Sequence, residues 1–175
     1  MDAIIASLIV IGIRFVVPFT LLRWPLAGVV ACILADHFDF HVFQHFGYGL
    51  WDGQYQQWDK IFDTWYLFFA FLNVRHWHDR LANLTGQLLF LCRFAGVAIF
   101  LISGWEQALV IAPNIMENFY LFWLIAMRWF PFQLTRKRVG IILIALGLPK
   151  LGQELFMHWL YPGKGFAWLL REKIF

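Results

Sequence analysis

The chain has 175 residues, of which 61% are hydrophobic and 20% are aromatic, while only 14% are charged. Soluble domains carry about 25% charged residues, so this composition excludes an ordinary soluble protein. The formal net charge of +3 comes from basic residues in short segments beside apolar runs, where membrane topology accounts for them better than nucleic-acid binding does. We therefore expect an all-α, polytopic integral membrane helix bundle in contact with the lipid bilayer, and no nucleic-acid partner.

Apolar runs of about 20 residues, the length that crosses a hydrocarbon core of about 30 Å, recur along the chain. They predict about six transmembrane helices in a single transmembrane domain over residues 1–175. The predicted spans, in chain order, are 3–22, 25–47, 60–75, 84–103, 108–130 and 139–160. We expect residues 161–175 to form an interfacial tail. The first apolar run lacks a basic leader and is long enough to span, so we expect a first helix rather than a cleaved signal.

Basic residues are more numerous in the first, third and fifth connections between the predicted spans than on the opposite side of the membrane. The basic residues of these connections are Arg23, Arg75, Arg80, Arg128, Arg136, Lys137 and Arg138. The opposite side carries Lys60, Lys164, Arg171 and Lys173. Because cytoplasmic loops carry the excess of Lys and Arg, we expect a multi-pass protein with both termini on the non-cytoplasmic side.

Charged residues recur inside the predicted spans at similar depths. Counting about 1.5 Å per residue from each span end places a first group near the membrane midplane, namely Arg14, Asp36, Arg93, Glu117 and Lys150. A second group lies between that level and the non-cytoplasmic surface, namely Asp39, Asp63, Glu154 and His158, with Asp59 and Lys60 at the mouth. A charge that faces lipid at mid-depth costs at least about 2.5 kcal/mol. We therefore expect these groups to face a buried polar cavity that opens to the non-cytoplasmic side.

The residue types in this layer suggest three chemical roles. Carboxylate oxygens are the ligands of hard divalent cations such as Mg²⁺, Mn²⁺ or Ca²⁺, and the candidate metal ligands are Asp36, Asp39, Asp59 and Asp63. Positioned carboxyl groups act as general acids or bases, and the candidate catalytic groups are Asp63, Glu117 and Glu154. Cations and amides bind anionic headgroups, and the candidate substrate-binding residues are Arg14, Arg93, Lys150, Asn114 and Asn118.

The same charges also fit an internal network of ion pairs, which is the usual state of intramembrane charge. Arg14, Arg93 and Lys150 lie at a depth where they can neutralise three carboxylates. Three bases against five acids leave two carboxylates to be balanced by a bound cation or by protonation. A functional site and a mainly structural network both remain open on the sequence.

Histidines add a separate stripe to the second predicted span. His37, His41 and His45 recur every four residues, and steps of about 100° per residue put them on a different face from Asp36 and Asp39. Two histidines at i, i+4 have the spacing of a zinc or copper site, but no third ligand is defined. We expect these histidines to form hydrogen bonds between helices or to lie near the outer interface.

The aspartate spacing resembles part of a known signature. Asp36-x-x-Asp39, followed by Asp59-x-x-x-Asp63 on the next predicted helix, looks like the motif of the CDP-alcohol phosphotransferases, which are also six-helix proteins. The resemblance implies that Asp36, Asp39 and Asp59 bind divalent metal. It also implies that Asp63 acts with them as the base that activates the acceptor hydroxyl.

The chain departs from that signature at several positions within residues 36–63. Phe40 stands where the signature has a glycine after the second aspartate, and Tyr55 replaces the glycine before the third. The Ala-Arg pair of the signature is missing as well. The carboxylates are therefore present without the parts of the motif that contact the nucleotide.

The sequence predicts a metal-assisted membrane enzyme that acts on a lipid-linked or phosphate-bearing substrate. A proton- or cation-coupled transporter that uses the same residues as a relay is the second hypothesis. A third is a non-catalytic subunit whose charges fix helix packing, together with a membrane-protein partner or further copies of the chain.

Overall fold

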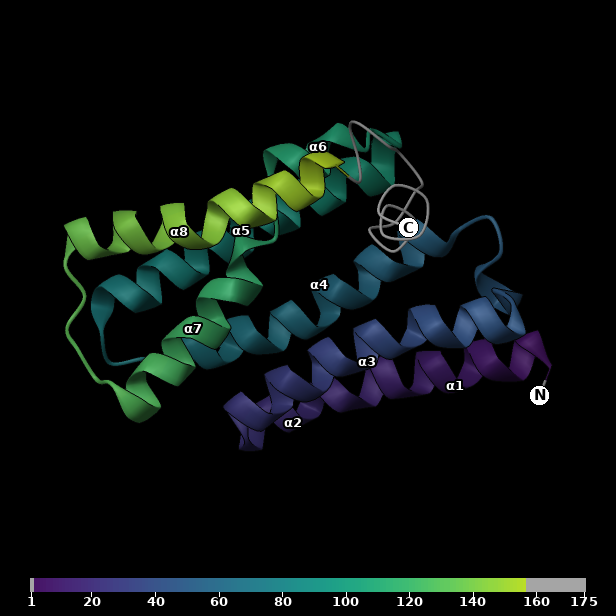
Figure 1. Ribbon diagram of the computed structural model, residues 1–175, viewed down its shortest axis with the longest axis horizontal. Coiled ribbons are helices and arrows are strands. Elements are labelled where there is room, and N and C mark those ends of the chain that lie inside the picture. Colours follow the sequence, from purple (N-terminus) through teal and green to yellow (C-terminus); the bar gives the residue numbers. More distant parts are fainter. Residues whose placement is uncertain (1, 157–175) are drawn as a thin grey trace, which may run out of the picture. The chain divides into compact units, whose positions relative to one another are not determined.

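The computed structural model describes residues 2–156, which form α-helices and short 3-10 turns without any β-strand. The helices in chain order are α1 (Ala3–Val16), α2 (Thr20–Arg23), α3 (Pro25–Phe46), α4 (Tyr55–Val74), α5 (Arg80–Ser103), α6 (Gln107–Ile111), α7 (Ile115–Trp129) and α8 (Arg136–Leu155) (Figure 1). The all-α prediction is confirmed for this part of the chain. The chain divides into two compact units, the first comprising Met1–Trp77 with Trp123–Pro131 and the second His78–Phe122 with Phe132–Phe175.

Four helical segments are long and apolar enough to cross a membrane. They are Ala3–Arg23, Pro25–Phe46, Arg80–Ser103 and Gln107–Trp129. These four segments support the assignment of the chain as a membrane protein. They coincide with four of the predicted spans to within a few residues. Helices α4 and α8 each have 20 residues but carry more charged side chains than these four segments. Asp59, Lys60 and Asp63 are those of α4. The six-span topology, the single domain and the sidedness remain predictions, and the tail 161–175 lies outside the described residues.

Helices α1 to α4 pack together in the first unit (Figure 1). Pro25 occupies the first position of α3, where its missing N–H costs little. Gly28, one turn later, lies so close to α2 that an added Cβ would be 2.7 Å from the backbone nitrogen of Leu21. The glycine therefore allows the backbones of α2 and α3 to touch.

A buried apolar cluster joins three helices and a connecting turn of the first unit. Its members are Val10 of α1, Phe43 of α3, Trp51 of the 3-10 turn Gly49–Trp51 and Phe62 of α4. The rings of Trp51 and Phe62 are stacked with their centroids 5.7 Å apart. This packing joins α1, α3 and α4, the three helices that carry the charged residues described below.

The second unit contains α5, α6 and α8, which are in mutual contact. Asp79 caps α5, because its Oδ1 accepts hydrogen bonds from the backbone N–H groups of Leu81 and Ala82 at 2.9 and 3.0 Å. Gly96 of α5 faces α6 and the residue after it, and an added Cβ would lie 2.5 Å from Cβ of Ala112. The helix thus leaves room for the interruption between α6 and α7.

The close approach at Gly28 leads to a test with a matched control. Gly28→Ala should lower the free energy of unfolding by about 1–3 kcal/mol, because the methyl group meets backbone atoms that cannot rotate away. Gly12→Ala, where an added Cβ meets nothing within 4 Å, should leave stability unchanged or raise it by about 0.5–1 kcal/mol. Unfolding of the full chain in mixed detergent micelles measures both, and equal stability of the two variants would contradict the packing.

Candidate functional site

A single guanidinium lies among four aspartates in the first unit. Nη1 of Arg14 donates to Oδ2 of Asp39 at 2.6 Å and to Oδ1 of Asp59 at 2.9 Å. Nη2 of Arg14 donates to Oδ1 of Asp36 at 2.6 Å and to Oδ1 of Asp63 at 2.8 Å. Each of the four carboxylates therefore takes a charge-assisted hydrogen bond from the same side chain.

Helical spacing explains how three helices bring these side chains together. Arg14 lies in the last turn of α1. Asp36 and Asp39 are three residues apart on α3, and Asp59 and Asp63 are four residues apart on α4, so each pair lies on one face of its helix. These two faces converge on Arg14.

Two further side chains of α4 complete the group. Nζ of Lys60 lies 2.7 Å from Oδ2 of Asp59 and 3.4 Å from Oδ2 of Asp63. The hydroxyl of Tyr55 donates to Oδ1 of Asp39 at 3.3 Å. We define the Arg14 cluster as Arg14, Asp36, Asp39, Tyr55, Asp59, Lys60 and Asp63.

Lys60 differs from its predicted place at the mouth of a cavity, because it is buried with 9% exposure. It stands three residues before Asp63 on the same helix face, which is the spacing that allows the ion pair. Sequence reasoning missed Tyr55 as a member of this group. The signal was its position four residues before Asp59, which puts both on one stripe of α4.

The Arg14 cluster is closed on one side and open on the other. The side chains of Arg14 and Asp39 are 4% and 1% exposed, whereas that of Asp36 is 46% exposed. Four carboxylates against one guanidinium and one ammonium leave a formal charge of −2. Buried charges are tolerated only when they are paired, so this excess calls for a further cation or for protonation of carboxyl groups.

The donor set fits a divalent cation. One oxygen each from Asp36, Asp39 and Asp59 lie within 4.8 Å of one another. Ca²⁺ binds carboxylate oxygens at about 2.3–2.6 Å, so oxygens on opposite sides of the ion lie about 4.6–5.2 Å apart. The spacing of the three oxygens is therefore compatible with one cation of this size.

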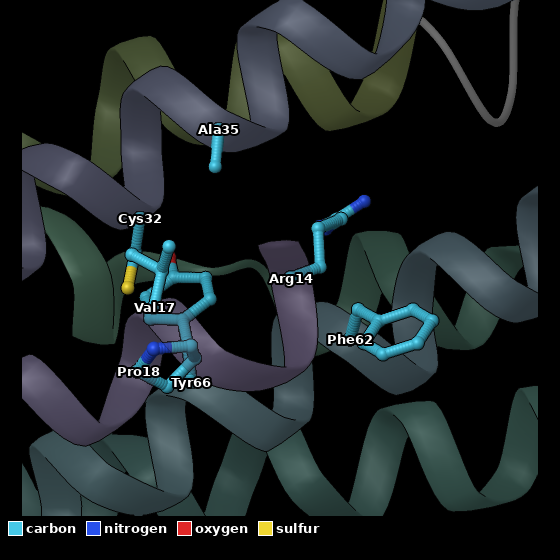
Figure 2. Close-up of a pocket in the computed structure, with 7 residues that line it drawn as sticks. All are labelled: Arg14, Val17, Pro18, Cys32, Ala35, Phe62 and Tyr66. Atoms are coloured by element: carbon cyan, nitrogen blue, oxygen red, sulfur yellow. The ribbon is translucent and has the colours of Figure 1, made fainter. Parts of the chain in front are cut away.

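A small pocket adjoins the cluster, and Figure 2 shows Arg14 and Phe62 on one side of it and Cys32, Val17 and Pro18 on the other. Its volume is about 10 Å³, which is room for about one water molecule. Most of its lining is apolar. This pocket therefore gives no support to the open polar cavity expected from the sequence, and the carboxylates form a close-packed ion-pair group instead.

A second arginine lies in the second unit, where the helix breaks between α6 and α7. Arg93 of α5 is 1% exposed, and its Nη1 donates to the carbonyl oxygens of Ala112 at 2.9 Å and Leu109 at 3.3 Å. Leu109 would normally accept from the residue four positions later, which is Pro113 and has no N–H. Nη2 of Arg93 also lies 3.5 Å from Oε1 of Glu154, which is 2% exposed. Arg93 thus replaces backbone hydrogen bonds that the break removes.

The remaining predicted site residues lie outside the Arg14 cluster, and only some of them contact one another. Asn114 donates through Nδ2 to Oε2 of Glu117 at 2.8 Å, and its Oδ1 accepts from the backbone N–H of Glu117 at 3.4 Å. Among residues 2–156, no hydrogen bond or ion pair brings Lys150 or Asn118 into either arginine group. The structure therefore joins Arg93 with Glu154 and Asn114 with Glu117, and one polar layer through both units remains a prediction.

The histidine stripe faces away from the buried aspartate, as the sequence predicts. His37, His41 and His45 are exposed, whereas Asp39 is buried. The rings of His37 and His41 are 5.0 Å apart in an edge-to-face arrangement. The histidines are therefore not part of the Arg14 cluster.

Comparison of the chain with protein-family models, with curated proteins and with solved structures finds no match. The structure does bring together the four aspartates on which the CDP-alcohol phosphotransferase resemblance depends. The likeness is limited to this spacing of aspartates, and the chain is not assigned to that family.

Removal of the Arg14 guanidinium, which four carboxylates share, should destabilise the first unit. Arg14→Gln leaves four carboxylates with Lys60 alone, so the free energy of unfolding should fall by about 3–5 kcal/mol. The exposed Arg23 gives a control, since Arg23→Gln should change stability by less than about 0.5 kcal/mol. Adding Asp39→Asn to Arg14→Gln should recover part of the loss. Detergent unfolding curves measure each variant, and an Arg14→Gln effect as small as the control would rule out the cluster.

Proposed function

We propose that the protein is a divalent-cation-dependent integral membrane enzyme that acts on a lipid-linked, phosphate-bearing substrate at the Arg14 cluster. The observation that carries this proposal is the formal charge of −2 of the Arg14 cluster, in which four converged aspartates face one arginine and one lysine. A structural network alone would favour balanced charges, because each uncompensated buried carboxylate costs free energy. The apolar helices around the cluster support a membrane substrate.

The aspartates of the cluster have two different roles in this proposal. Asp36, Asp39 and Asp59 are the metal ligands, since their oxygens lie within reach of one ion. A bound divalent cation would act as a Lewis acid that polarises a phosphate oxygen. Asp63, which is held by Arg14 and Lys60, would accept the proton of a hydroxyl group that attacks the phosphorus, while the bond from phosphorus to the leaving group breaks.

Arg14 acts as a positioning residue in this proposal. Its four terminal N–H groups are used by four carboxylates, which differs from the anion-binding role predicted for it. Those bonds hold the four carboxylates together around the guanidinium. The open edge at Asp36 is the side from which a substrate reaches the cluster, because the other side is closed by buried Asp39.

Titration with Mn²⁺, followed by electron paramagnetic resonance on the full chain in detergent, tests the cation site. Asp39→Asn should weaken Mn²⁺ binding by at least about tenfold, because even indirect partners of a metal cost 10–100-fold when they are removed. Asp52→Asn removes an exposed carboxylate outside the cluster and should leave binding unchanged. Arg14→Gln, where the protein still folds, should strengthen binding because it removes a competing cation.

Equal Mn²⁺ affinity of wild type, Asp39→Asn and Asp52→Asn would reject the metal site. The enzymatic part has its own readout, which is the phospholipid pattern of membranes that contain wild type or Asp39→Asn protein. A lipid species made only with the wild type is the expected result. An unchanged pattern together with intact Mn²⁺ binding would leave a cation site without this catalytic role.

Proton- or cation-coupled transport is the second candidate, and the break at Pro113 is the observation that favours it. Interrupted membrane helices surround the ion and substrate sites of many transporters. In this chain the interruption is accompanied by the buried pair of Arg93 and Glu154. Proton flux into proteoliposomes that is lost in Glu154→Gln and kept in Asp39→Asn would favour transport over the enzyme.

A further inference from the structure

An apolar groove lies on the second unit, apart from the residues discussed so far. Its lining consists of Phe122, Phe132, Arg138, Ile141 and Ile142, and its volume is about 310 Å³. Pockets that hold small molecules measure about 300–1,000 Å³. The groove therefore has enough room to bury part of an extended apolar chain.

Arg138, which lines this groove, is one of three basic residues in the first turn of α8. Arg136, Lys137 and Arg138 are all exposed. Arg138 is held in place, because its guanidinium lies 5.6 Å from the centre of the Phe132 ring and Nη1 donates to the carbonyl oxygen of Gln133 at 2.9 Å. A fixed guanidinium on the wall of an apolar groove joins an anion-binding group to an apolar surface.

The positive charge of this turn is not neutralised by an acidic side chain of residues 2–156. Asp79 is the carboxylate bound to this connection, and its Oδ2 accepts from the backbone N–H of Leu134 at 3.1 Å while its Oδ1 caps α5. Within residues 2–156, no carboxylate forms an ion pair with Arg136, Lys137 or Arg138. The groove therefore offers charge complementarity to an anionic ligand with an apolar tail.

We propose that this groove binds one molecule of anionic phospholipid. The headgroup phosphate contacts Arg138, with Arg136 and Lys137 adding attraction, and an acyl chain lies along Phe122, Ile141 and Ile142. The charge pattern of the chain predicts that this connection is cytoplasmic, the side on which anionic lipids attract basic segments. The site uses none of the residues of the Arg14 cluster, so it stands independently of the proposed function.

Native mass spectrometry of the full chain in a neutral detergent tests this site, with dioleoylphosphatidylglycerol and dioleoylphosphatidylcholine as probes. The wild type should retain one molecule of the anionic lipid in preference to the zwitterionic one. Arg138→Gln should weaken retention about fivefold, and the combined R136Q, K137Q and R138Q variant about a hundredfold, at about one fivefold step per basic residue near the headgroup. Arg23→Gln is the matched control, because it removes an exposed charge outside the groove, and it should stay within about twofold of the wild type.

The groove needs a separate variant, because the basic residues test only the headgroup. Ile141→Gln alters a wall residue that is 57% exposed, so the fold should tolerate it, and lipid retention should fall with the charges intact. Unfolding curves check that each variant remains folded. Equal retention of the two lipids, an Arg23→Gln loss as large as that of Arg138→Gln, or full retention by Ile141→Gln would each overturn the proposal. Displacement of the lipid by millimolar inorganic phosphate would do so as well, since it would indicate a site for a free anion.

Discussion

The guanidinium of Arg14 is the constraint on which the first unit depends. It takes one carboxylate from each of four positions on α3 and α4, at distances between 2.6 and 2.9 Å. Those carboxylates could not share so small a volume within apolar helices without a cation between them. The cluster thus fixes how α1, α3 and α4 meet, while the close approach at Gly28 and the packing of Trp51 on Phe62 bring their ends together. The four carboxylates together with Arg14 and Lys60 leave a net negative charge. The same side chains therefore stabilise the first unit and supply the excess charge on which the proposed cation binding depends.

In the second unit, a buried arginine compensates for an interrupted helix rather than for clustered carboxylates. A proline in the middle of an apolar segment leaves backbone carbonyl groups without helical donors, and such groups are costly in a hydrocarbon environment. Arg93 donates to two of these carbonyl oxygens and is itself accompanied by Glu154. Arg14 therefore binds side-chain carboxylates, whereas Arg93 donates hydrogen bonds to backbone carbonyl groups. In both cases a buried charge is explained by the groups that it contacts rather than by exposure to a ligand.

Much of the helix layout could be predicted, because apolar length and helical periodicity are local properties of the sequence. The stripe of Asp59 and Asp63 and the separation of His37 from Asp39 follow from residue spacing alone. The sharing of one arginine by four aspartates could not be predicted, since it depends on how three helices pack. Depth counting assigned Arg14, Arg93 and Lys150 to one layer, yet it could not reveal that Arg93 serves a broken helix. Lys60 was misplaced because position in a span does not determine which way a side chain points.

The most direct measurement is a crystal structure of the full chain grown with saturating Mn²⁺, with diffraction data collected at the manganese absorption edge. We expect an anomalous peak among the oxygens of Asp36, Asp39 and Asp59, with Arg14 still bonded to at least one aspartate. Absence of a peak, with Arg14 bonded to all four carboxylates at full occupancy, would contradict the cation site and leave the cluster as a structural network.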